Sequence, residues 1–154
     1  MDQVILVCGP AGSGKSTYAR TLESRGYRRL SFDEIAWDLG YREHPVRPAA
    51  ADIVHGVIQE QLVRVLADGG RAVVDTSFWS RASRARYRTF LAPLGVTPVV
   101  HYLSTPRETI LARLASRAGT HGDDVVVPPD LAVAYLDGFE VPTADEGPLR
   151  VITG

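Results

Sequence analysis

The chain has 154 residues, a formal net charge of −1, and 45% hydrophobic against 23% charged residues. These values suit one globular domain with one core, and they exclude a strongly basic protein that charge alone would draw to nucleic acid. No apolar run approaches the roughly 20 residues of a membrane span, and the single cysteine, Cys8, leaves no intrachain disulfide. Since the first apolar run starts at Val4, we expect no signal peptide, no membrane partner and a cytoplasmic protein.

The first predicted element is a buried strand over residues 4–8, an uninterrupted β-branched and aliphatic run typical of a parallel sheet. It is followed by Gly-Pro-Ala-Gly-Ser-Gly-Lys-Ser at 9–16, a G-x-x-x-x-G-K-S pattern, and by a stretch over 17–23 that lacks Gly and Pro and predicts a helix. Strand, glycine-rich loop and helix together are the context of a phosphate-binding P-loop. The glycines let backbone N–H groups turn toward phosphate oxygens, and the helix N-terminus adds partial positive charge.

Two side chains of this loop have separate expected roles, since Lys15 can reach the β- and γ-phosphates of a nucleotide and the Ser16 hydroxyl can ligate Mg²⁺. Lys15 is also the only lysine among the 17 basic residues, so a compact charge on a flexible stem is kept at this one place. The alternative is a glycine-rich turn with a solvated lysine. We therefore expect ATP and Mg²⁺ as cofactors. The predicted nucleotide-binding residues are Gly9, Ala11, Gly12, Ser13, Gly14, Lys15, Ser16 and Thr17.

Acidic residues follow or end the next two predicted strands, at 27–32 and 71–75. Ligands collect at the carboxyl ends of strands in open α/β sheets, so Asp33 is placed to accept or orient the proton of an attacking hydroxyl. Its alternative is helix capping, because Ser31 and Glu34 form a capping-box pattern. Asp75 resembles the Walker B acid that holds Mg²⁺ or its water shell, and its alternative is to cap the helix that follows.

Between these strands lie a segment rich in bulky side chains at 34–42 and a helix at 49–68. Trp37 and Tyr41 are either walls of an acceptor pocket or simple packing residues. The helix carries apolar residues at helical spacing, and we interpret it as structural.

The helix after Asp75 contains four arginines, Arg81, Arg84, Arg86 and Arg88. Their spacing spreads them around the helix and predicts a solvated surface, with a phosphate-rich acceptor as the alternative.

A further strand at 96–103 and a helix opened by Thr105-Pro106 follow. Arg113 and Arg117 are four residues apart on one face of this helix and lead into a stretch with two glycines. This arrangement suits a lid whose arginines close over a transferring phosphate; the alternative is a pair of surface arginines. A helix at 129–139 and a strand at 149–153 complete five strands alternating with helices. The fold class we predict is α/β, a three-layer α/β/α sandwich with a parallel sheet.

The chain resembles a group of small P-loop kinases that includes the kinase domain of phage polynucleotide kinase, chloramphenicol phosphotransferase and the zeta toxins, whose relatives are called AAA-family ATPases. The resemblance covers nearly the whole chain. It rests on the loop at 9–17, on Asp33, on Asp75-Thr76, and on residues 113–130, where two arginines precede Val-Pro-Pro-Asp. It implies one P-loop kinase domain over 1–154, strand order 2-3-1-4-5 and a lid at about 113–128.

The resemblance also implies that Asp33 is the general base for the acceptor hydroxyl, and that Arg117, with Arg113, contacts the ATP phosphates. The polynucleotide kinase pattern has an arginine three residues after the catalytic aspartate, and this chain has Ala36 there. We therefore expect an ATP- and Mg²⁺-dependent kinase that phosphorylates a hydroxyl of a small molecule such as a metabolite, nucleoside or antibiotic. The alternatives are a polynucleotide 5′-hydroxyl kinase and a nucleotide-dependent ATPase or switch module.

Overall fold

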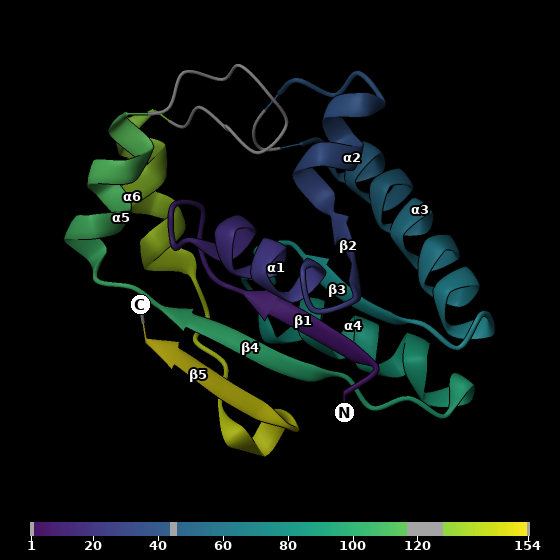
Figure 1. Ribbon diagram of the computed structural model, residues 1–154. Helices are drawn as coiled ribbons and strands as arrows, with labels where there is room; N and C mark the ends of the chain where they lie inside the picture. The colour runs from purple at the N-terminus through teal and green to yellow at the C-terminus, as the bar shows by residue number, and fades with distance from the viewer. Residues whose placement is uncertain (1, 44–45, 117–127, 154) are drawn as a thin grey trace.

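The computed structural model of the protein describes residues 2–43, 46–116 and 128–153. Its strands are β1 (Val4–Cys8), β2 (Tyr27–Ser31), β3 (Arg71–Asp75), β4 (Val99–Ser104) and β5 (Leu149–Thr153). They form one parallel sheet in the order β2-β3-β1-β4-β5 (Figure 1). The predicted fold class and strand order are confirmed.

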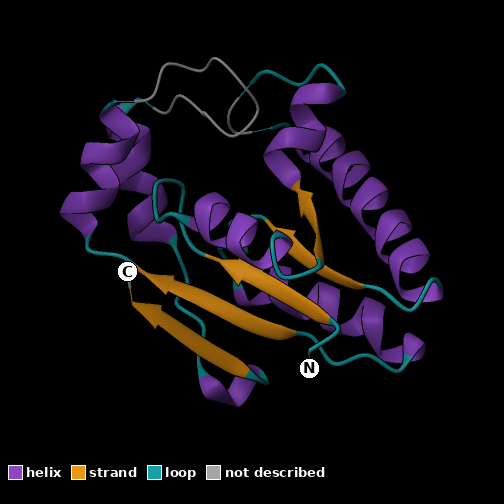
Figure 2. Cartoon of the chain, in the orientation of Figure 1, coloured by secondary structure: helices purple, strands orange, loops and turns teal. Residues whose placement is uncertain are grey.

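Six α-helices join and flank these strands in the described ranges: α1 (Lys15–Glu23), α2 (Phe32–Asp38), α3 (Pro48–Ala67), α4 (Arg81–Leu91), α5 (Arg107–Ala115) and α6 (Pro129–Gly138). Helices cover both faces of the sheet, as Figure 2 shows. None of them is both long and apolar enough to cross a membrane.

The alternation of side chains along β1 assigns the two faces of the sheet. Leu6 belongs to the larger core, with Ile58 of α3 and Tyr87 of α4, whereas Val7 belongs to the smaller core under α1, with Leu22. Successive residues of a strand point to opposite faces, so the uninterrupted apolar run at 4–8 supplies both cores. A separate apolar cluster joins α5 to α6 near the carboxyl ends of the strands (Figure 1).

Element boundaries shift by a few residues where a particular side chain decides them. The predicted strand at 96–103 begins only at Val99, after Pro98, which cannot donate a ladder hydrogen bond. The strand predicted over 27–32 ends at Ser31, because the Ser31 hydroxyl accepts a hydrogen bond from the Glu34 amide and begins α2.

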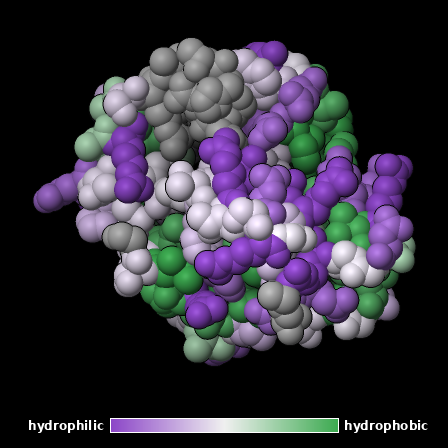
Figure 3. Space-filling view, in the orientation of Figure 1, coloured by the Kyte–Doolittle hydropathy of each residue, from purple (hydrophilic) through white to green (hydrophobic). Residues whose placement is uncertain are grey.

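The two edge strands are β2 and β5. On β5, Ile152 packs against the smaller core, whereas Val151 is 55% exposed. In Figure 3 hydrophobic side chains reach the surface around β4 and β5, while hydrophilic side chains dominate the area over α1.

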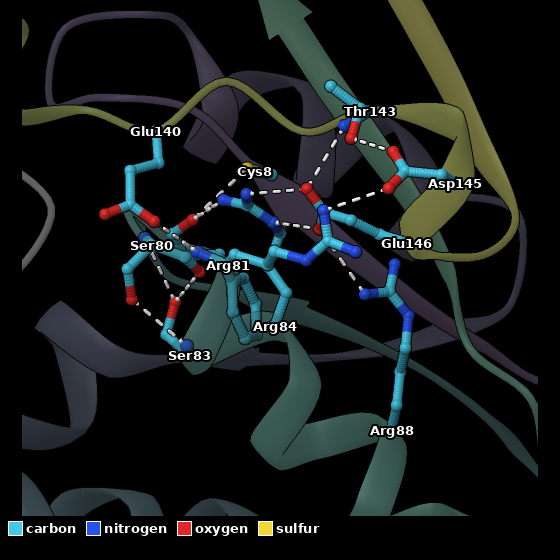
Figure 4. Close-up of polar contacts among 11 residues, drawn as sticks. Cys8, Ser80, Arg81, Ser83, Arg84, Arg88, Glu140, Thr143, Asp145 and Glu146 are labelled. Atoms are coloured by element: carbon cyan, nitrogen blue, oxygen red, sulfur yellow. Dashed lines mark hydrogen bonds and ion pairs between the residues drawn. The ribbon is translucent and has the colours of Figure 1, made fainter.

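The expectation that the arginines of α4 are all solvated is wrong for Arg84. Its side chain is fully buried and makes two hydrogen bonds to Glu146, Nε to Oε1 at 2.8 Å and Nη2 to Oε2 at 3.0 Å. Glu146 lies in a short 3₁₀ turn (Ala144–Glu146) just before β5, outside the helix and the strand predicted at 129–139 and 149–153. The pair therefore ties the C-terminal segment to α4 (Figure 4).

Candidate active site

The P-loop has the backbone that its glycines predict. Gly12 and Gly14 have φ values of +85° and +95°, a region that favours glycine. A Cβ on Gly9 would lie 2.4 Å from the Ser13 hydroxyl oxygen and 3.1 Å from the Ser13 Cβ, so a side chain at position 9 would require Ser13 to shift. Helix α1 starts directly after the loop, at Lys15, and this residue is only 7% exposed.

Hydrogen bonds from neighbouring loops hold the P-loop in place. The Gly9 amide donates to the Ser77 carbonyl at 3.1 Å, and the Thr105 hydroxyl donates to the Ser13 carbonyl at 2.7 Å. These contacts come from the segments that follow β3 and β4. The loop conformation is thus fixed by the protein itself, as an anion site with preorganised amides requires.

Arg113 reaches the P-loop from α5. Its Nη1 donates to the Gly12 carbonyl at 3.2 Å and lies 3.2 Å from where a Cβ on Gly14 would be. Arg117 lies outside the described residues, as does most of the predicted lid. The structure therefore brings one of the two predicted lid arginines to the phosphate-binding loop.

Asp33 lies in the first turn of α2, beyond the carboxyl end of β2. The helix is capped by Ser31, and the Glu34 carboxylate pairs with Arg29, with Nη1 to Oε2 at 2.7 Å. The capping function therefore belongs to Ser31. Asp33 instead borders the same cavity as Lys15.

Asp75 is buried at the end of β3, beside Ser31 of β2 and Val7 of β1. Its Oδ2 accepts two hydrogen bonds from Arg29, from Nε at 3.2 Å and from Nη2 at 2.9 Å. The next helix is capped by Ser80. Asp75 thus lies beside the phosphate-binding loop and does not cap α4. Arg29 carried no sequence signal, because an arginine in an edge strand is an ordinary surface residue until its neighbour is known.

The donor chemistry of Ser16 and Asp75 fits Mg²⁺. Ser16 lies in the first turn of α1 and offers a hydroxyl, and Asp75 offers a carboxylate at the neighbouring strand end. Mg²⁺ takes few protein ligands in nucleotide sites and completes its shell with phosphate oxygens and water. The described residues contain no cluster of three or more His, Cys, Asp or Glu side chains that could hold a metal ion.

A cavity of about 500 Å³ opens beside the P-loop. Lys15, Asp33 and Thr76 line its polar part. Aromatic side chains from α2, from the segment after β3 and from the α6 end of the chain line the rest, namely Phe32, Phe78, Trp79, Tyr135 and Phe139. This volume is typical of small-molecule sites.

Neither Trp37 nor Tyr41 borders this cavity. The Trp37 ring packs under the Arg42 guanidinium, 3.7 Å from the ring centroid, and Tyr41 packs against the larger core. The interpretation of these two residues as pocket walls is therefore wrong, and their packing alternative is correct. The actual walls were missed because they come from segments far apart in the chain.

His55 of α3 is a further polar residue of the cavity that sequence reasoning missed. Its Nδ1 is hydrogen-bonded to the Tyr87 hydroxyl at 2.7 Å, and its ring packs 5.0 Å from that of Phe32. Burial, helped by the positive charge of Arg86, lowers the pKa of His55 to about 4. The imidazole is therefore neutral at pH 7.

The backbone of residues 78 and 79 is hydrogen-bonded to two residues of the cluster in Figure 4, Arg84 and Glu140. Arg84 Nη1 donates to the Phe78 carbonyl at 2.7 Å, and the Glu140 amide donates to the Trp79 carbonyl at 2.7 Å. Phe78 has a φ of +47°, which is unusual for a bulky residue. The buried ion pair between Arg84 and Glu146 thus supports this strained backbone next to the cavity.

A parallel sheet in this order, with a glycine-rich loop joining β1 to α1, defines the P-loop class of nucleotide-binding proteins. The family model described as an AAA domain matches residues 4–142, and the chain belongs to that family.

Solved structures with this fold are similar over nearly the full chain. A candidate kinase from Chloroflexus aurantiacus is 18% identical, with a TM-score of 0.77 over 99% of this chain and 88% of that one. A gluconokinase from Sinorhizobium meliloti is 22% identical, with a TM-score of 0.69 over 97% and 81% of the two chains. Kti12 from Chaetomium thermophilum, bound to ADP-AlF3, is 19% identical, with a TM-score of 0.74 over 97% and 88%. At such identities the similarity shows the fold alone. A search among curated proteins gave no match.

Proposed function

We propose that this protein is an ATP- and Mg²⁺-dependent kinase that transfers the γ-phosphoryl group to a hydroxyl of a small molecule. One observation carries the proposal. The P-loop lysine, Lys15, and the carboxylate of Asp33 line the same small cavity. A phosphate donor and an acceptor hydroxyl would therefore meet between a cation and a base.

In this mechanism the loop amides and Lys15 bind the β- and γ-phosphates, and Asp33 accepts or orients the proton of the attacking hydroxyl. Arg113, already hydrogen-bonded to the loop carbonyl of Gly12, offsets charge on the phosphates, and Arg117 is proposed to join it. Ser16 and Asp75 would hold Mg²⁺, which supplies charge neutralisation on the phosphates when bound. Phosphoryl transfer needs mainly positioning and charge stabilisation, which these residue types provide.

A small acceptor is favoured over a polynucleotide. Ala36, at the position of the acceptor-phosphate arginine in polynucleotide kinase, is buried in the larger core. No arginine is among the described residues that line the cavity. A strand end carrying phosphates would therefore find no guanidinium among these described residues to bind it.

The test is transfer of labelled γ-phosphate from ATP to a 5′-hydroxyl oligonucleotide and, separately, to a set of hydroxylated small molecules. Asp33→Asn should reduce transfer by roughly 10²–10⁴-fold while ATP affinity stays the same, because general-base catalysis is typically worth that much. Asp38→Asn, an exposed residue at the end of the same helix, is the matched control and should transfer phosphate at the wild-type rate.

Transfer that survives in the Asp33 variant would contradict the role given to this residue. A protein that hydrolyses ATP equally well with and without Asp33, and that phosphorylates none of the acceptors, would instead be an ATPase or switch module.

A further inference from the structure

We propose that the acceptor pocket selects an uncharged, predominantly apolar alcohol, and that His55 provides a neutral polar contact to it. This inference rests on the proposed kinase function, since it names the class of hydroxyl compound that Asp33 would serve. It excludes sugars, other polyols and nucleic-acid ends as the preferred acceptors.

Much of the cavity wall is aromatic. Phe32, Phe78, Tyr135 and Phe139 present aromatic surface to the cavity from separate elements. Phe139 is held in place by stacking on Tyr102, with ring centroids 6.0 Å apart. Thr76, Ser77 and Ser83 also line the cavity, and the Ser83 hydroxyl is already hydrogen-bonded to the Ser80 carbonyl at 2.7 Å. A polyol with more hydroxyls than these few partners can serve would exchange hydrogen bonds to water for contacts with carbon, which costs free energy for each hydroxyl left without a partner.

Charged side chains are few among the described residues that line the cavity. Among the described residues that line the cavity, the side chains charged at neutral pH are Lys15 and Asp33. The proposed reaction uses both of them, on the phosphate and on the attacking hydroxyl. Nothing in this lining is therefore left to pair with a charged group on the acceptor, and a buried unpaired charge is strongly disfavoured.

His55 offers a ligand one neutral hydrogen-bonding atom. Its Nδ1 is engaged with the hydroxyl of Tyr87, a residue only 1% exposed, so Nε2 is the ring nitrogen that a ligand could meet. A neutral imidazole has one donor and one acceptor nitrogen. It therefore suits one neutral polar atom of an otherwise apolar ligand.

Trp79 borders the cavity and is nevertheless 55% exposed to solvent. The Glu140 amide fixes its backbone, so this indole stands at the cavity as apolar surface that a ligand can cover. A bound apolar body would remove it from water, which is favourable in proportion to the area buried.

The experiment compares two acceptors that share a primary alcohol on a saturated ring of the same size, cyclohexylmethanol and glucose, each with ATP and Mg²⁺. The chain has two tryptophans, so Trp37→Phe leaves Trp79 as the only indole. Trp37 does not line the cavity, which makes this variant a suitable reporter. Binding is followed by Trp79 emission, and catalysis by transfer of labelled phosphate in the wild-type protein.

We expect cyclohexylmethanol to shift the Trp79 emission to shorter wavelength in a saturable manner and to be phosphorylated with a kcat/KM at least roughly tenfold above that of glucose. Trp79→Phe, which retains Trp37, should show no such shift. Ala134→Asp places a carboxylate in the lining of the cavity and should weaken binding at least tenfold. Val133→Asp, exposed on the same helix and outside the lining, is its matched control and should not.

The other possible results separate a failure of this inference from a failure of the proposed kinase function. An emission shift with cyclohexylmethanol and not with glucose, without phosphate transfer to either, would support the apolar pocket and overturn the proposed kinase function. Equal or better transfer to glucose or to a 5′-hydroxyl oligonucleotide would support the kinase and overturn this inference. No shift and no transfer with cyclohexylmethanol would also overturn it.

Discussion

At the scale of single residues, the ion pair between Arg84 and Glu146 shows how much a buried charge depends on its partner. Both side chains are almost completely buried, at 0% and 3% exposure, and Arg88 adds a longer contact to the same carboxylate at 3.5 Å. The pair also carries the hydrogen bond to the Phe78 carbonyl at the cavity wall. Glu146 therefore contributes to stability and to the shape of the proposed acceptor pocket.

Removing this carboxylate charge should be costly. Glu146→Gln leaves the guanidinium of Arg84 buried without a counter-charge, and we expect the free energy of unfolding to fall by about 3 kcal/mol, measured by urea denaturation. The neighbouring Asp145→Asn is the matched control, because the pair of Asp145 with Arg81 is exposed at 68% and 55% of the two side chains. Exposed pairs contribute less than about 1 kcal/mol. Similar losses of unfolding free energy in both variants would show that burial does not increase the contribution of the pair between Arg84 and Glu146.

At the scale of elements, the P-loop depends on its packing against α5 as well as on its own glycines. A Cβ on Gly12 would lie 3.0 Å from the Ile110 carbonyl oxygen and 3.1 Å from Leu114 Cγ, both on α5. The helix that carries Arg113 is thus in direct contact with the loop that it is proposed to assist. Any side chain at Gly12 would push the two apart.

Gly12→Ala should therefore weaken ATP binding by at least about tenfold, through backbone strain and displacement of α5. Gly40→Ala is the matched control, because Gly40 also has a positive φ, +92°, and a Cβ there meets no atom within 4 Å. It should lose about 1–2 kcal/mol of stability through its own strained backbone and keep its ATP affinity in isothermal titration. Unchanged ATP affinity in the Gly12 variant would argue against a tight fit between loop and helix.

At the scale of the whole molecule, two buried titratable groups make stability depend on pH in the same direction. The pKa of His55 is lowered to about 4, so the unfolded chain binds its proton more readily and stability is lost as pH falls from about 6.5 to 4. Hydrogen bonds from Arg84 lower the pKa of Glu146 to about 2. The stability from this carboxylate is complete above about pH 4.5 and is lost as pH falls toward 2.

The protein should therefore be most stable near neutral pH and lose about 2 kcal/mol between pH 6.5 and 4, measured by urea denaturation across that range. His55→Gln should flatten this part of the profile. The slope that remains reports on His101, whose pKa burial also lowers, and below about pH 4.5 on Glu146 as well. An unchanged slope in the His55 variant would show that His55 does not titrate on unfolding.

The sequence alone determined the parallel sheet, the P-loop with Lys15 at the start of the helix that follows it, and the places of Asp33 and Asp75 at the carboxyl ends of strands. These follow from local signals, such as the apolar run before Gly9 and the glycines that the positive-φ backbone of the loop favours. The strand order came from the family resemblance. Positions at the carboxyl ends of parallel strands converge in any such sheet, so residues far apart in sequence could be predicted to meet.

Only the tertiary structure decided which side chains surround the acceptor. The cavity draws residues from α2, α3, α6 and the segment after β3, and nothing in the local pattern of Phe78, Trp79 or Phe139 distinguishes a wall from a core residue. The same holds for Arg84 and Arg29. The helical position of Arg84 predicted solvent and the strand position of Arg29 predicted no role, whereas in the fold each guanidinium is paired with a carboxylate distant in sequence, Glu146 or Asp75. Local propensity fixes elements, whereas pairing across the fold fixes pockets and buried charges.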